Sequence, residues 1–285
     1  MKKFIALMLA LVLVTCCFAA CGQQAPTADQ APSADQAPAA DDTTAAAEDD
    51  GVETDLEYVT ANGTLVVGIT EYAPMDYKDE NGEWTGFDAE LAREFAEELG
   101  VECEFFVLAD WGKKFFELDA KNIDCVWNGM TITEEATSNS TVSDPYVINA
   151  QVVVMAEDKL ANYPDAESMK DLVFAVEEGS AGQSVAEEAG LKTVAKQDQA
   201  GALMEVAAGT ADACVIDITM ANAMTGEGTD YAALGVGISL SSEEYGVSFR
   251  TGSELAEKLN EFLAAKKADG SLQALADKYQ LTLAE

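Results

Sequence analysis

The chain has 285 residues, of which 48% are hydrophobic, so it can bury one sizeable core or two small ones. Its 52 acidic and 16 basic side chains give a formal net charge of −36, which repels nucleic acid and anionic lipid and argues against polyanion binding. Histidine is absent, so the usual general base and the commonest metal ligand are missing. These features lower the expectation of catalysis, and neither a cofactor nor a metal site is expected.

The N-terminal residues have the pattern of an export signal. A basic start precedes an apolar run over 4–14, which is too short to span a bilayer comfortably. The sequence FAACG follows, and two small residues before a cysteine resemble the bacterial lipobox. We therefore predict that residues 1–21 form a lipoprotein signal peptide with lipidation at Cys21. Cys16 and Cys17 remain rival sites, and an ordinary cleaved signal peptide is the alternative.

Residues 22–55 have the composition of a disordered, acidic, Ala/Pro-rich linker. Three imperfect repeats, APTADQ, APSADQ and APAADD, are followed by TTAAAEDDGVETD. Proline, alanine and acidic residues leave almost nothing large to bury. About 35 residues of this kind have an r.m.s. span of roughly 30–35 Å. An acylated cysteine, a flexible tether and a folded body together predict a surface-attached protein, because two acyl chains anchor durably.

The folded body is predicted to begin at residue 56 with alternating strands and helices. Residues 64–69 form a buried-strand candidate, and the sequence DENGEW indicates a turn. The spacing of apolar residues predicts a helix over 88–99 that ends at Gly100. The next expected elements are a strand over 103–108, a helix over 113–121 and a strand over 123–127. This alternation is typical of a parallel α/β sheet.

The same alternation starts again after residue 150. Expected strands are 151–155, 173–176 and 213–217, and expected helices are 184–189 and 202–208. A strand over 245–249 leads back and is followed by helices over 253–267 and 271–279. Two α/β lobes of about 90 residues each fit this order better than one large sheet. Three thiols fall in apolar runs and are predicted to be buried: Cys103, Cys125 and Cys214.

The segment WNGMTITEEATSN, residues 127–139, has the pattern of a small-anion site. A strand runs into Asn128 and Gly129, and threonines then alternate with apolar residues before a helix that opens at Thr133. Strand, glycine, hydroxyls and helix N-terminus commonly bind a small anion through backbone N–H groups. Such a site is usually reinforced by an arginine fork, and this segment has no arginine.

Six segments, taken in their order along the chain, carry a resemblance to a known family: YAPMDYKDENGEWTGFDAELAREFAEELG (72–100), DCVWNGMTIT (124–133), SDPY (143–146), VEEGSAG (176–182), ADACVID (211–217) and YGVSFRTGSELAEKLNEFLAAKKADGSLQALADKY (245–279). Together they resemble the family 3 extracellular solute-binding proteins of amino-acid ABC transporters. The resemblance implies an α/β, periplasmic-binding-protein-like fold of type II, the two-lobed Venus flytrap. Two crossover hinge strands are expected near 147–154 and 245–250. Lobe 1 would comprise 56–149 and 244–285, and lobe 2 would comprise 150–243.

The resemblance also implies a set of ligand contacts in both lobes. Two aromatic side chains match walls of the ligand site: Tyr72 and Trp111. One loop matches the group that offers backbone and hydroxyl donors to a carboxylate: Asn128, Gly129 and Thr131. The glycine loop of the second lobe corresponds to Gly179, Ser180 and Ala181. Asp217 matches the carboxylate that pairs with the ligand's α-ammonium group.

The match fails at Ala136, where the family usually places the arginine that clamps the α-carboxylate. The chain contains only two arginines. Arg93 lies beside acidic residues on the expected wet face of its helix, and Arg250 lies beyond the returning strand, so neither is an obvious substitute. Lys113 or Lys114 could supply a point charge, although Lys113 is expected to be solvated and a lysine does not reproduce the fork.

Two further acids are expected near the ligand: Glu71 and Glu177. With Asp217 they would make the pocket acidic, which suits a cationic or zwitterionic amine. The loop at 128–131 then either holds a carboxylate with neutral donors alone, or the ligand lacks a carboxylate. A dicarboxylic amino acid is the least expected ligand.

The predicted function is capture of a small amino acid or amine by the substrate-binding component of an ABC importer, which delivers it to a membrane permease. The expected protein is a non-enzymatic monomer, lipid-anchored on the outer face of the bacterial cytoplasmic membrane, with no nucleic-acid partner. One alternative is an extracellular sensor of the same fold that signals to a membrane partner. Another is an enzyme, since a few relatives of this fold are dehydratases, but the missing histidine and acid/base pair weigh against it.

Overall fold

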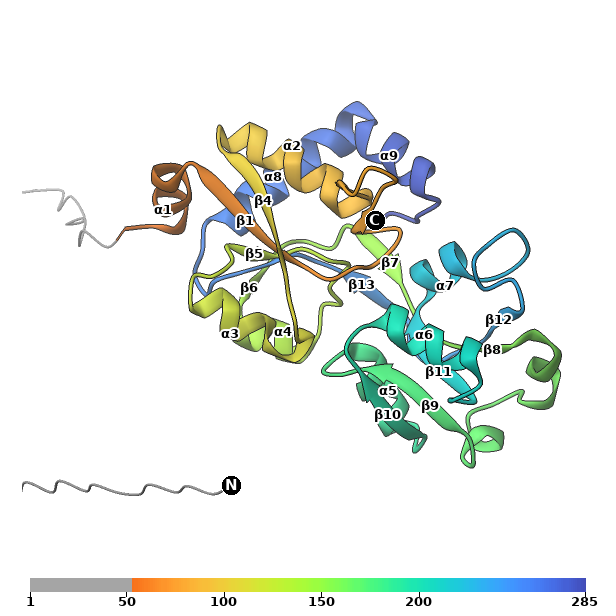
Figure 1. Cartoon of the computed structure of the whole chain (residues 1–285). Helices are drawn as coiled ribbons and strands as arrows, with labels where there is room; N and C mark the ends of the chain where they lie inside the picture. Colours follow the sequence, from red (N-terminus) through yellow and green to blue (C-terminus); the bar gives the residue numbers. More distant parts are fainter. Residues whose placement is uncertain (1–52) are drawn as a thin grey trace, which may run out of the picture. The chain divides into compact units, whose positions relative to one another are not determined.

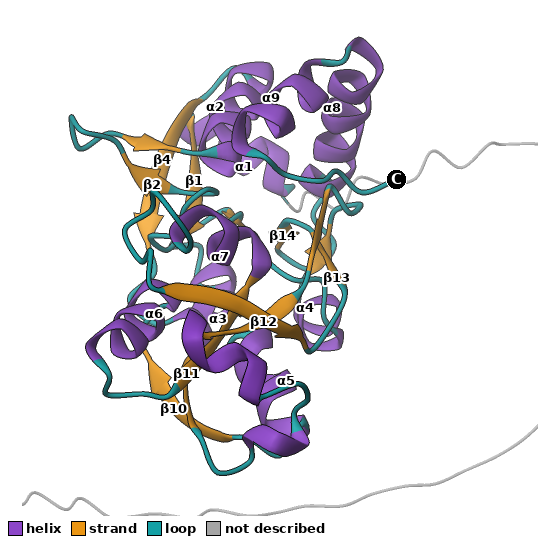
Figure 2. Cartoon of the chain, turned by 90° about the vertical axis from the view of Figure 1, so that its right-hand side faces the viewer, coloured by secondary structure: helices purple, strands orange, loops and turns teal. Residues whose placement is uncertain are grey.

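The computed structural model describes residues 53–285, which form two α/β lobes joined by a pair of strands (Figure 1). The predicted signal peptide, Cys21 and the linker up to residue 52 lie outside the described residues. Each lobe is built on one five-stranded sheet. Figure 2 shows helices, in purple, around the orange strands of both lobes. No helix within residues 53–285 is long and apolar enough to cross a membrane.

The sheet of lobe 1 has the strand order β4-β1-β5-β14-β6. Its strands are β1 (Thr64–Ile69), β4 (Glu102–Val107), β5 (Cys125–Val126), β6 (Thr141–Val142) and β14 (Ser248–Phe249). The first three are parallel, whereas β14 runs antiparallel to both β5 and β6. A short hairpin, β2 (Tyr77–Lys78) with β3 (Trp84–Thr85), surrounds the predicted turn. The C-terminal part of the chain, through β14, therefore completes the sheet of lobe 1.

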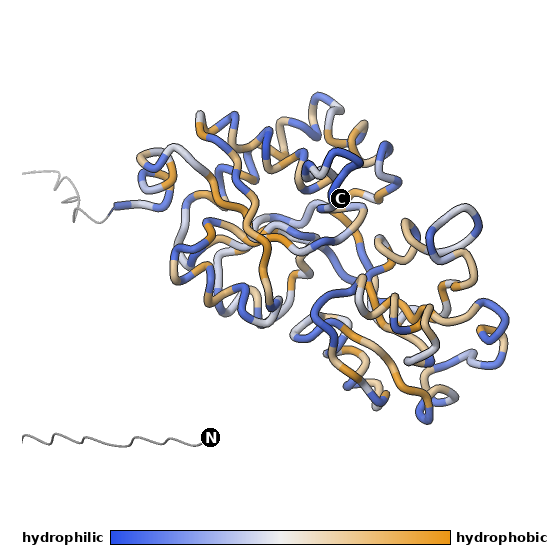
Figure 3. Tube along the Cα trace, viewed as in Figure 1, coloured by the Kyte–Doolittle hydropathy of each residue, from blue (hydrophilic) through white to orange (hydrophobic). Residues whose placement is uncertain are grey.

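Helices cover both faces of this sheet because its strand residues alternate between two apolar clusters. On one face α2 (Phe87–Leu99), α8 (Leu255–Asp269) and α9 (Ser271–Tyr279) pack over Leu65 and Val67. On the other face α3 (Lys114–Asp119) and α4 (Glu134–Asn139) pack with Val66 and Val126. The hydropathy colouring shows apolar residues along these strands (Figure 3). Alternation with period two thus divides one sheet between two cores.

The sheet of lobe 2 has the order β10-β9-β11-β8-β12. Its strands are β8 (Gln151–Ala156), β9 (Val173–Glu177), β10 (Lys192–Lys196), β11 (Ala213–Asp217) and β12 (Leu234–Ser239). Strands β9, β10 and β11 are parallel, and β8 is antiparallel to both β11 and β12. The covering helices are α5 (Ala181–Glu188), α6 (Gln199–Ala208) and α7 (Ile218–Met224). Two 3₁₀ turns, η2 (Glu157–Asn162) and η3 (Glu167–Met169), complete the lobe.

The two lobes are connected by paired strands rather than by loose linkers. Strand β7 (Val147–Asn149) pairs antiparallel with β13 (Glu243–Tyr245), so that Asn149 lies directly opposite Glu243. Both strands run from one lobe to the other (Figure 1). The prediction of two crossover strands in a two-lobed type II fold is therefore confirmed.

Several elements were not predicted, and the longer ones, α1, β10, α7 and β12, have weak patterns. Helix α1 (Asp55–Asn62) depends on a capping box between Thr54 and Glu57. Strand β10 has mainly exposed or half-buried residues, and α7 follows β11 without a loop. Strand β12 contains Gly235 and Gly237, whose missing side chains make room for Leu160. The expected helix over 113–121 is instead a 3₁₀ turn, η1 (Trp111–Lys113), followed by α3.

Buried charges also fix the return of the chain into lobe 1. Arg250 donates to Asp124 Oδ1 at 2.9 Å and to Asp55 Oδ1 at 2.8 Å. It also donates to the carbonyl oxygens of Leu118 and Ile123 at 3.3 and 2.7 Å. Arg250 thus joins α1, α3 and the residues just before β5. The three predicted buried thiols are free, with two of them buried and Cys103 half-buried.

Candidate functional site

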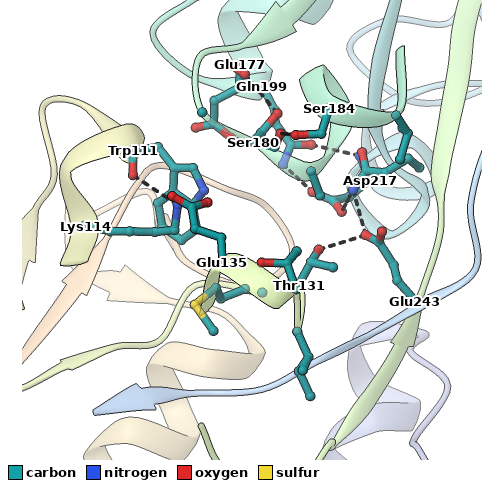
Figure 4. A pocket seen from close by; sticks show the side chains of 18 of the residues that line it. Trp111, Lys114, Thr131, Glu135, Glu177, Ser180, Ser184, Gln199, Asp217 and Glu243 are labelled. Atoms are coloured by element: carbon teal, nitrogen blue, oxygen red, sulfur yellow. Dashed lines mark hydrogen bonds between the residues drawn. The ribbon is translucent and has the colours of Figure 1, made fainter. Parts of the chain in front are cut away.

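A cavity of about 420 Å³ lies between the lobes (Figure 4). Lobe 1 lines it with the loop after β5 and with the turn at Trp111, and lobe 2 lines it with the loop after β9, the start of α5 and the end of β11. The hinge region contributes Gln151 and Glu243. Most of the predicted ligand contacts meet here: Trp111, Asn128, Gly129, Thr131, Glu177, Ser180, Ala181 and Asp217, together with Gly179.

Two predicted contacts do not line the cavity. Tyr72 is only 2% exposed, and its hydroxyl is 2.5 Å from both Thr219 Oγ1 and Tyr245 Oη. Its ring lies directly behind Gly129, where an added Cβ would be 2.6 Å from the ring. Tyr72 therefore supports the loop from behind and reaches Thr219 of the other lobe. Glu71 is exposed and lies outside the cavity.

The loop after β5 is held in place by hydrogen bonds from behind. Asn128 accepts from the Thr70 N–H at 2.9 Å and donates to Thr70 Oγ1 at 2.8 Å, so its amide orients the loop. The Gly129 N–H donates to Asp88 Oδ2 at 2.6 Å. Burial raises the pKa of Asp88 to about 7, although the bonds from Gly129 and Tyr146 work against that rise. Gly129 has φ +56 and no space for a side chain, so glycine is required.

Thr131, two residues after Gly129, is the next residue of this loop to be considered at the cavity wall. Thr131 forms a β-bridge with Tyr245 in which the neighbours of the two residues exchange the bonds: Ile132 N–H to Glu244 and Gly246 N–H to Met130. In such an antiparallel pair the N–H and C=O of Thr131 point away from the partner strand. The Thr131 hydroxyl donates to Glu243 Oε1 at 2.8 Å. Thr131 thus has a free backbone N–H at the wall of the cavity, and its role toward a ligand stays a prediction.

In lobe 2, the loop after β9 lies against lobe 1. Ser180 caps α5 by accepting from the Gln183 N–H at 3.1 Å, and its hydroxyl donates to the Glu177 carbonyl at 2.9 Å. Gly179 has φ +71, and an added Cβ would lie 2.7 Å from the Gly112 Cα. Since Gly112 belongs to lobe 1, the two loops meet at the edge of the cavity. The structure is a closed arrangement at this edge.

Asp217 and Glu243 form an acidic pair that shares amide donors. Asp217 accepts hydrogen bonds from the side chains of Asn149, Gln151 and Gln199, with Gln151 Nε2 at 2.6 Å from Oδ1. Glu243 Oε1 accepts from Asn149 at 2.6 Å and from Gln151 at 2.7 Å. Burial, and next the negative charge of Glu243, raise the pKa of Asp217 to about 7. The two acidic groups therefore lie close together, and the amide groups that donate to them are neutral.

Glu177 is a further buried carboxyl group of the cavity. It is 4% exposed, and its Oε1 has no hydrogen-bond partner among residues 53–285. Burial raises the pKa of Glu177 to about 8, and the charges of Asp217 and Asp198 add to the rise. A buried acceptor without a partner is costly unless a ligand satisfies it.

The cation of the cavity is Lys114, the second of the two lysines considered from sequence. Among residues 53–285 it is the only cationic side chain in the lining. Lys113 is exposed and pairs with Asp110 at 2.8 Å, as expected for a solvated residue. Arg93 packs over the Phe105 ring, and Arg250 is bound to Asp124. Neither arginine replaces the one missing at Ala136, which is buried in α4.

The sequence did not indicate that Gln151, Gln199 and Glu243 are part of the site. Gln151 opens β8 and Glu243 lies in β13, so the two meet only through the hinge. Gln199 is the first residue of α6, and its side chain donates to the Asp217 carboxylate and accepts from the Asp217 N–H. A polar residue at the start of an otherwise apolar strand was the available signal for Gln151. No group of histidine, cysteine, aspartate or glutamate residues within 53–285 is arranged to hold a metal ion.

Two α/β lobes, paired crossover strands and a polar cavity between the lobes define a two-lobed ligand-binding protein. Residues 65–282 match the family model of the bacterial extracellular solute-binding proteins, family 3. The chain belongs to this family, which has a solute-binding role and acts outside the cytoplasm.

Curated relatives support the same class. The chain is 29% identical over 228 residues to the L-cystine-binding protein TcyJ of Escherichia coli K12, covering 79% of this chain and 85% of the relative. It is 30% identical over 238 residues to the L-arginine-binding protein of Pseudomonas aeruginosa, covering 77% and 88%. These relatives are named as binding proteins.

A solved structure agrees with the fold. The crystal structure of the ancestral amino acid-binding protein AncCDT-1, described as a precursor of cyclohexadienyl dehydratase, has a TM-score of 0.72 and 33% identity. The match covers 79% of this chain and 98% of that chain. The resemblance predicted from sequence is therefore confirmed at the level of family and fold.

Proposed function

We propose that the protein captures a small amino acid or related amine that carries positive charge, and delivers it to an ABC permease in the membrane. The observation that carries this proposal is the set of three carboxyl groups that line one cavity, of which the first two are buried and the third is half-buried: Glu177, Asp217 and Glu243. One lysine faces them, so the cavity has a negative balance that attracts a cation. The cystine- and arginine-binding names of the relatives support an amino acid as the ligand.

Asp217 would bind the ligand's ammonium group. Three amide side chains already hold this carboxylate in position, so little side-chain freedom is lost on binding. Trp111 and the backbone of Gly129, Thr131, Ser180 and Ala181 would surround the rest of the ligand. A desolvated ion pair in such a cleft changes affinity by about 2–5 kcal/mol when one partner is truncated. The mechanism is capture by closure of the lobes, without turnover.

The proposal includes attachment of a monomeric protein to the outer face of the cytoplasmic membrane through acylated Cys21. The basic start, the short apolar run and the small residues before Cys21 support it. A lipid anchor and a tether would keep a captured solute close to the permease. Globomycin, which blocks lipoprotein signal cleavage, should cause the unprocessed precursor to accumulate. Unaltered processing, or a mature protein without lipid by mass spectrometry, would contradict anchoring.

The ligand class is tested by thermal unfolding of the purified protein against single amino acids, polyamines and quaternary amines. A ligand at about 100 times its dissociation constant should stabilise the protein by about 2.7 kcal/mol, a shift of several degrees. L-arginine, L-lysine, L-cystine or another cationic or zwitterionic amine should shift the transition, and L-glutamate and L-aspartate should not. The largest shift with an acidic amino acid, or no shift with any amine, would contradict the proposal.

A further inference from the structure

We propose that Lys114 binds an anionic group of the ligand, so that the cavity selects amino acids over the corresponding amines without a carboxylate. This inference rests on the proposed function and narrows its ligand class. The first residue of α3 would then supply the positive charge that binds the anion. The segment after β5 supplies no such charge, because residue 136 is alanine.

Lys114 is buried although it is a lysine. It is 4% exposed, and its ammonium nitrogen lies 4.9 Å from the ring centroids of both Trp111 and Phe115. Its single hydrogen bond goes to the Trp111 carbonyl oxygen, at the long distance of 3.4 Å. An ammonium group has three N–H donors, so most of its donor capacity is unused by residues 53–285.

The Lys114 ammonium also lacks a carboxylate partner. It forms no ion pair with any carboxylate of residues 53–285, whereas Lys113, the preceding residue, pairs with Asp110. Burial lowers the pKa of Lys114, and the more distant charges of Glu135 and Glu177 counteract that shift without removing it. Buried charges are normally paired. An unpaired ammonium that borders a cavity is therefore a site for an anion.

The two charged regions of the cavity come from different lobes. Lys114 reaches the cavity from lobe 1 beside Trp111, and Asp217 reaches it from lobe 2, at the other side of the view in Figure 4. Glu177, with its unpartnered oxygen, also belongs to lobe 2. A ligand with both a carboxylate and an ammonium group would satisfy both lobes at once. A plain diamine would leave Lys114 unpaired and place like charge near it.

A purely structural role for Lys114 makes a different prediction. If Lys114 only offset the charge of Glu135 and Glu177, replacing it would change the affinity for all cationic ligands in the same direction. If Lys114 binds a carboxylate, its replacement would lower the affinity only for ligands that carry a carboxylate. Pairs of ligands that differ by that group therefore separate the two roles: L-arginine with agmatine, L-lysine with cadaverine and L-cystine with cystamine.

The test is calorimetric titration of these pairs into the purified protein and its Lys114→Met and Lys114→Gln variants. Lys113→Met is the matched control, since Lys113 is exposed and outside the cavity. Thermal unfolding without ligand checks that each variant is folded. The original protein should bind the amino acid of at least one pair about tenfold or more tightly than the amine. Both Lys114 variants should reduce that preference to about threefold or less, mainly through the amino acid, and Lys113→Met should keep it.

Equal affinity for both members of every pair in the original protein would overturn the role of Lys114, and this result needs no variant. A preference that survives in folded Lys114→Met or Lys114→Gln would overturn it as well. Either result would leave amine capture intact, because ligands would still bind. Absence of binding by all amino acids and amines would instead overturn the proposed function, and this inference with it.

Discussion

Glu177 shows how one buried carboxyl group can set the pH dependence of capture. Its pKa in the free cavity is about 8, raised by burial and by neighbouring acids. A bound cation would stabilise the charged form and lower that pKa, so binding must release a proton below pH 8. Affinity for a cationic ligand should therefore rise with pH up to about 8 and then level off.

Replacing Glu177 by glutamine should reduce this pH dependence. We expect affinity for the best cationic ligand to increase several-fold from pH 6 to pH 8 in the original protein. In Glu177→Gln the increase should be smaller, because only Asp217, with a pKa of about 7, still releases a proton. Titration calorimetry in two buffers of different ionisation enthalpy measures the protons released. Glu178→Gln is the control, since Glu178 is the exposed neighbour, and an identical pH profile in all three proteins would contradict the role of Glu177.

At the residue level, the sequence indicated types of side chain better than their directions. Asp217 ends an apolar strand and the 128–131 loop has a recognisable pattern, so both could be expected at the site. Lys113 and Lys114 are adjacent and chemically equal, and only the phase of α3 after the η1 turn sends Lys114 inward. Tyr72 also could not be placed, because its position behind Gly129 depends on contacts with Thr219 and Tyr245.

The loop between β9 and α5 is an element whose shape depends on one glycine. Gly179 lies against Gly112 of the other lobe, with no space for a methyl group. Gly179→Ala should hinder closure of the lobes and weaken ligand binding by about tenfold or more, since closure completes the cavity. Gly209→Ala is a matched control, because Gly209 has a similar φ of +74 and open space around it.

Titration calorimetry measures the effect on affinity, and small-angle X-ray scattering measures closure. Both variants carry the strain of a left-handed residue, so both should lose a similar amount of stability. Only Gly179→Ala should lose affinity and stay expanded when ligand is added. Equal affinity in the two variants would show that this contact does not limit closure.

Arg250 joins elements that are far apart in the sequence, and its loss should affect stability rather than selectivity. Arg250→Met leaves Asp124 and Asp55 buried without their partner, so the free energy of unfolding should fall by about 3–5 kcal/mol. Chemical denaturation measures this change, with Arg93→Met as the comparison, since Arg93 lies half-buried over Phe105. A ligand preference that changes in folded Arg250→Met would contradict a purely structural role.

At the level of elements, alternating apolar runs identified most of the strands and helices. Local pattern failed where tertiary contacts decide the structure. Strand β10 forms because it pairs with β9 along its whole length, although its own residues are mostly polar or exposed. Strand β12 keeps two glycines because Leu160 packs where their side chains would be. Neither contact is visible in a local window of sequence.

For the whole molecule, buried acids and a net charge of −36 predict an unusual pH dependence of stability. The pKa values of Asp88, Asp217 and Glu177 in the folded protein are about 7, 7 and 8, well above those of exposed acids. The folded state therefore binds more protons than the unfolded state between about pH 4 and 8, and its stability falls as pH rises through this range. Repulsion among the surface acids acts in the same direction.

The melting temperature of the ligand-free protein should consequently be several degrees higher at pH 5 than at pH 8. Added salt should recover part of the loss at pH 8 by screening surface charges, but not the part due to buried groups. Differential scanning calorimetry at constant ionic strength measures both effects. A melting temperature that rises steadily from pH 5 to pH 8 would show that these carboxyl groups are not protonated in the folded protein.

Asp217 is proposed to hold the cationic nitrogen of a ligand between the lobes, and one pair of titrations tests this role. The strongest ligand from the unfolding screen is titrated into the original protein and into Asp217→Asn. Asp212→Asn is the control, because Asp212 lies just before the same strand, exposed and outside the cavity. We expect Asp217→Asn to stay folded and to lose about 30-fold or more in affinity, while Asp212→Asn loses little. Unchanged affinity in folded Asp217→Asn would contradict it.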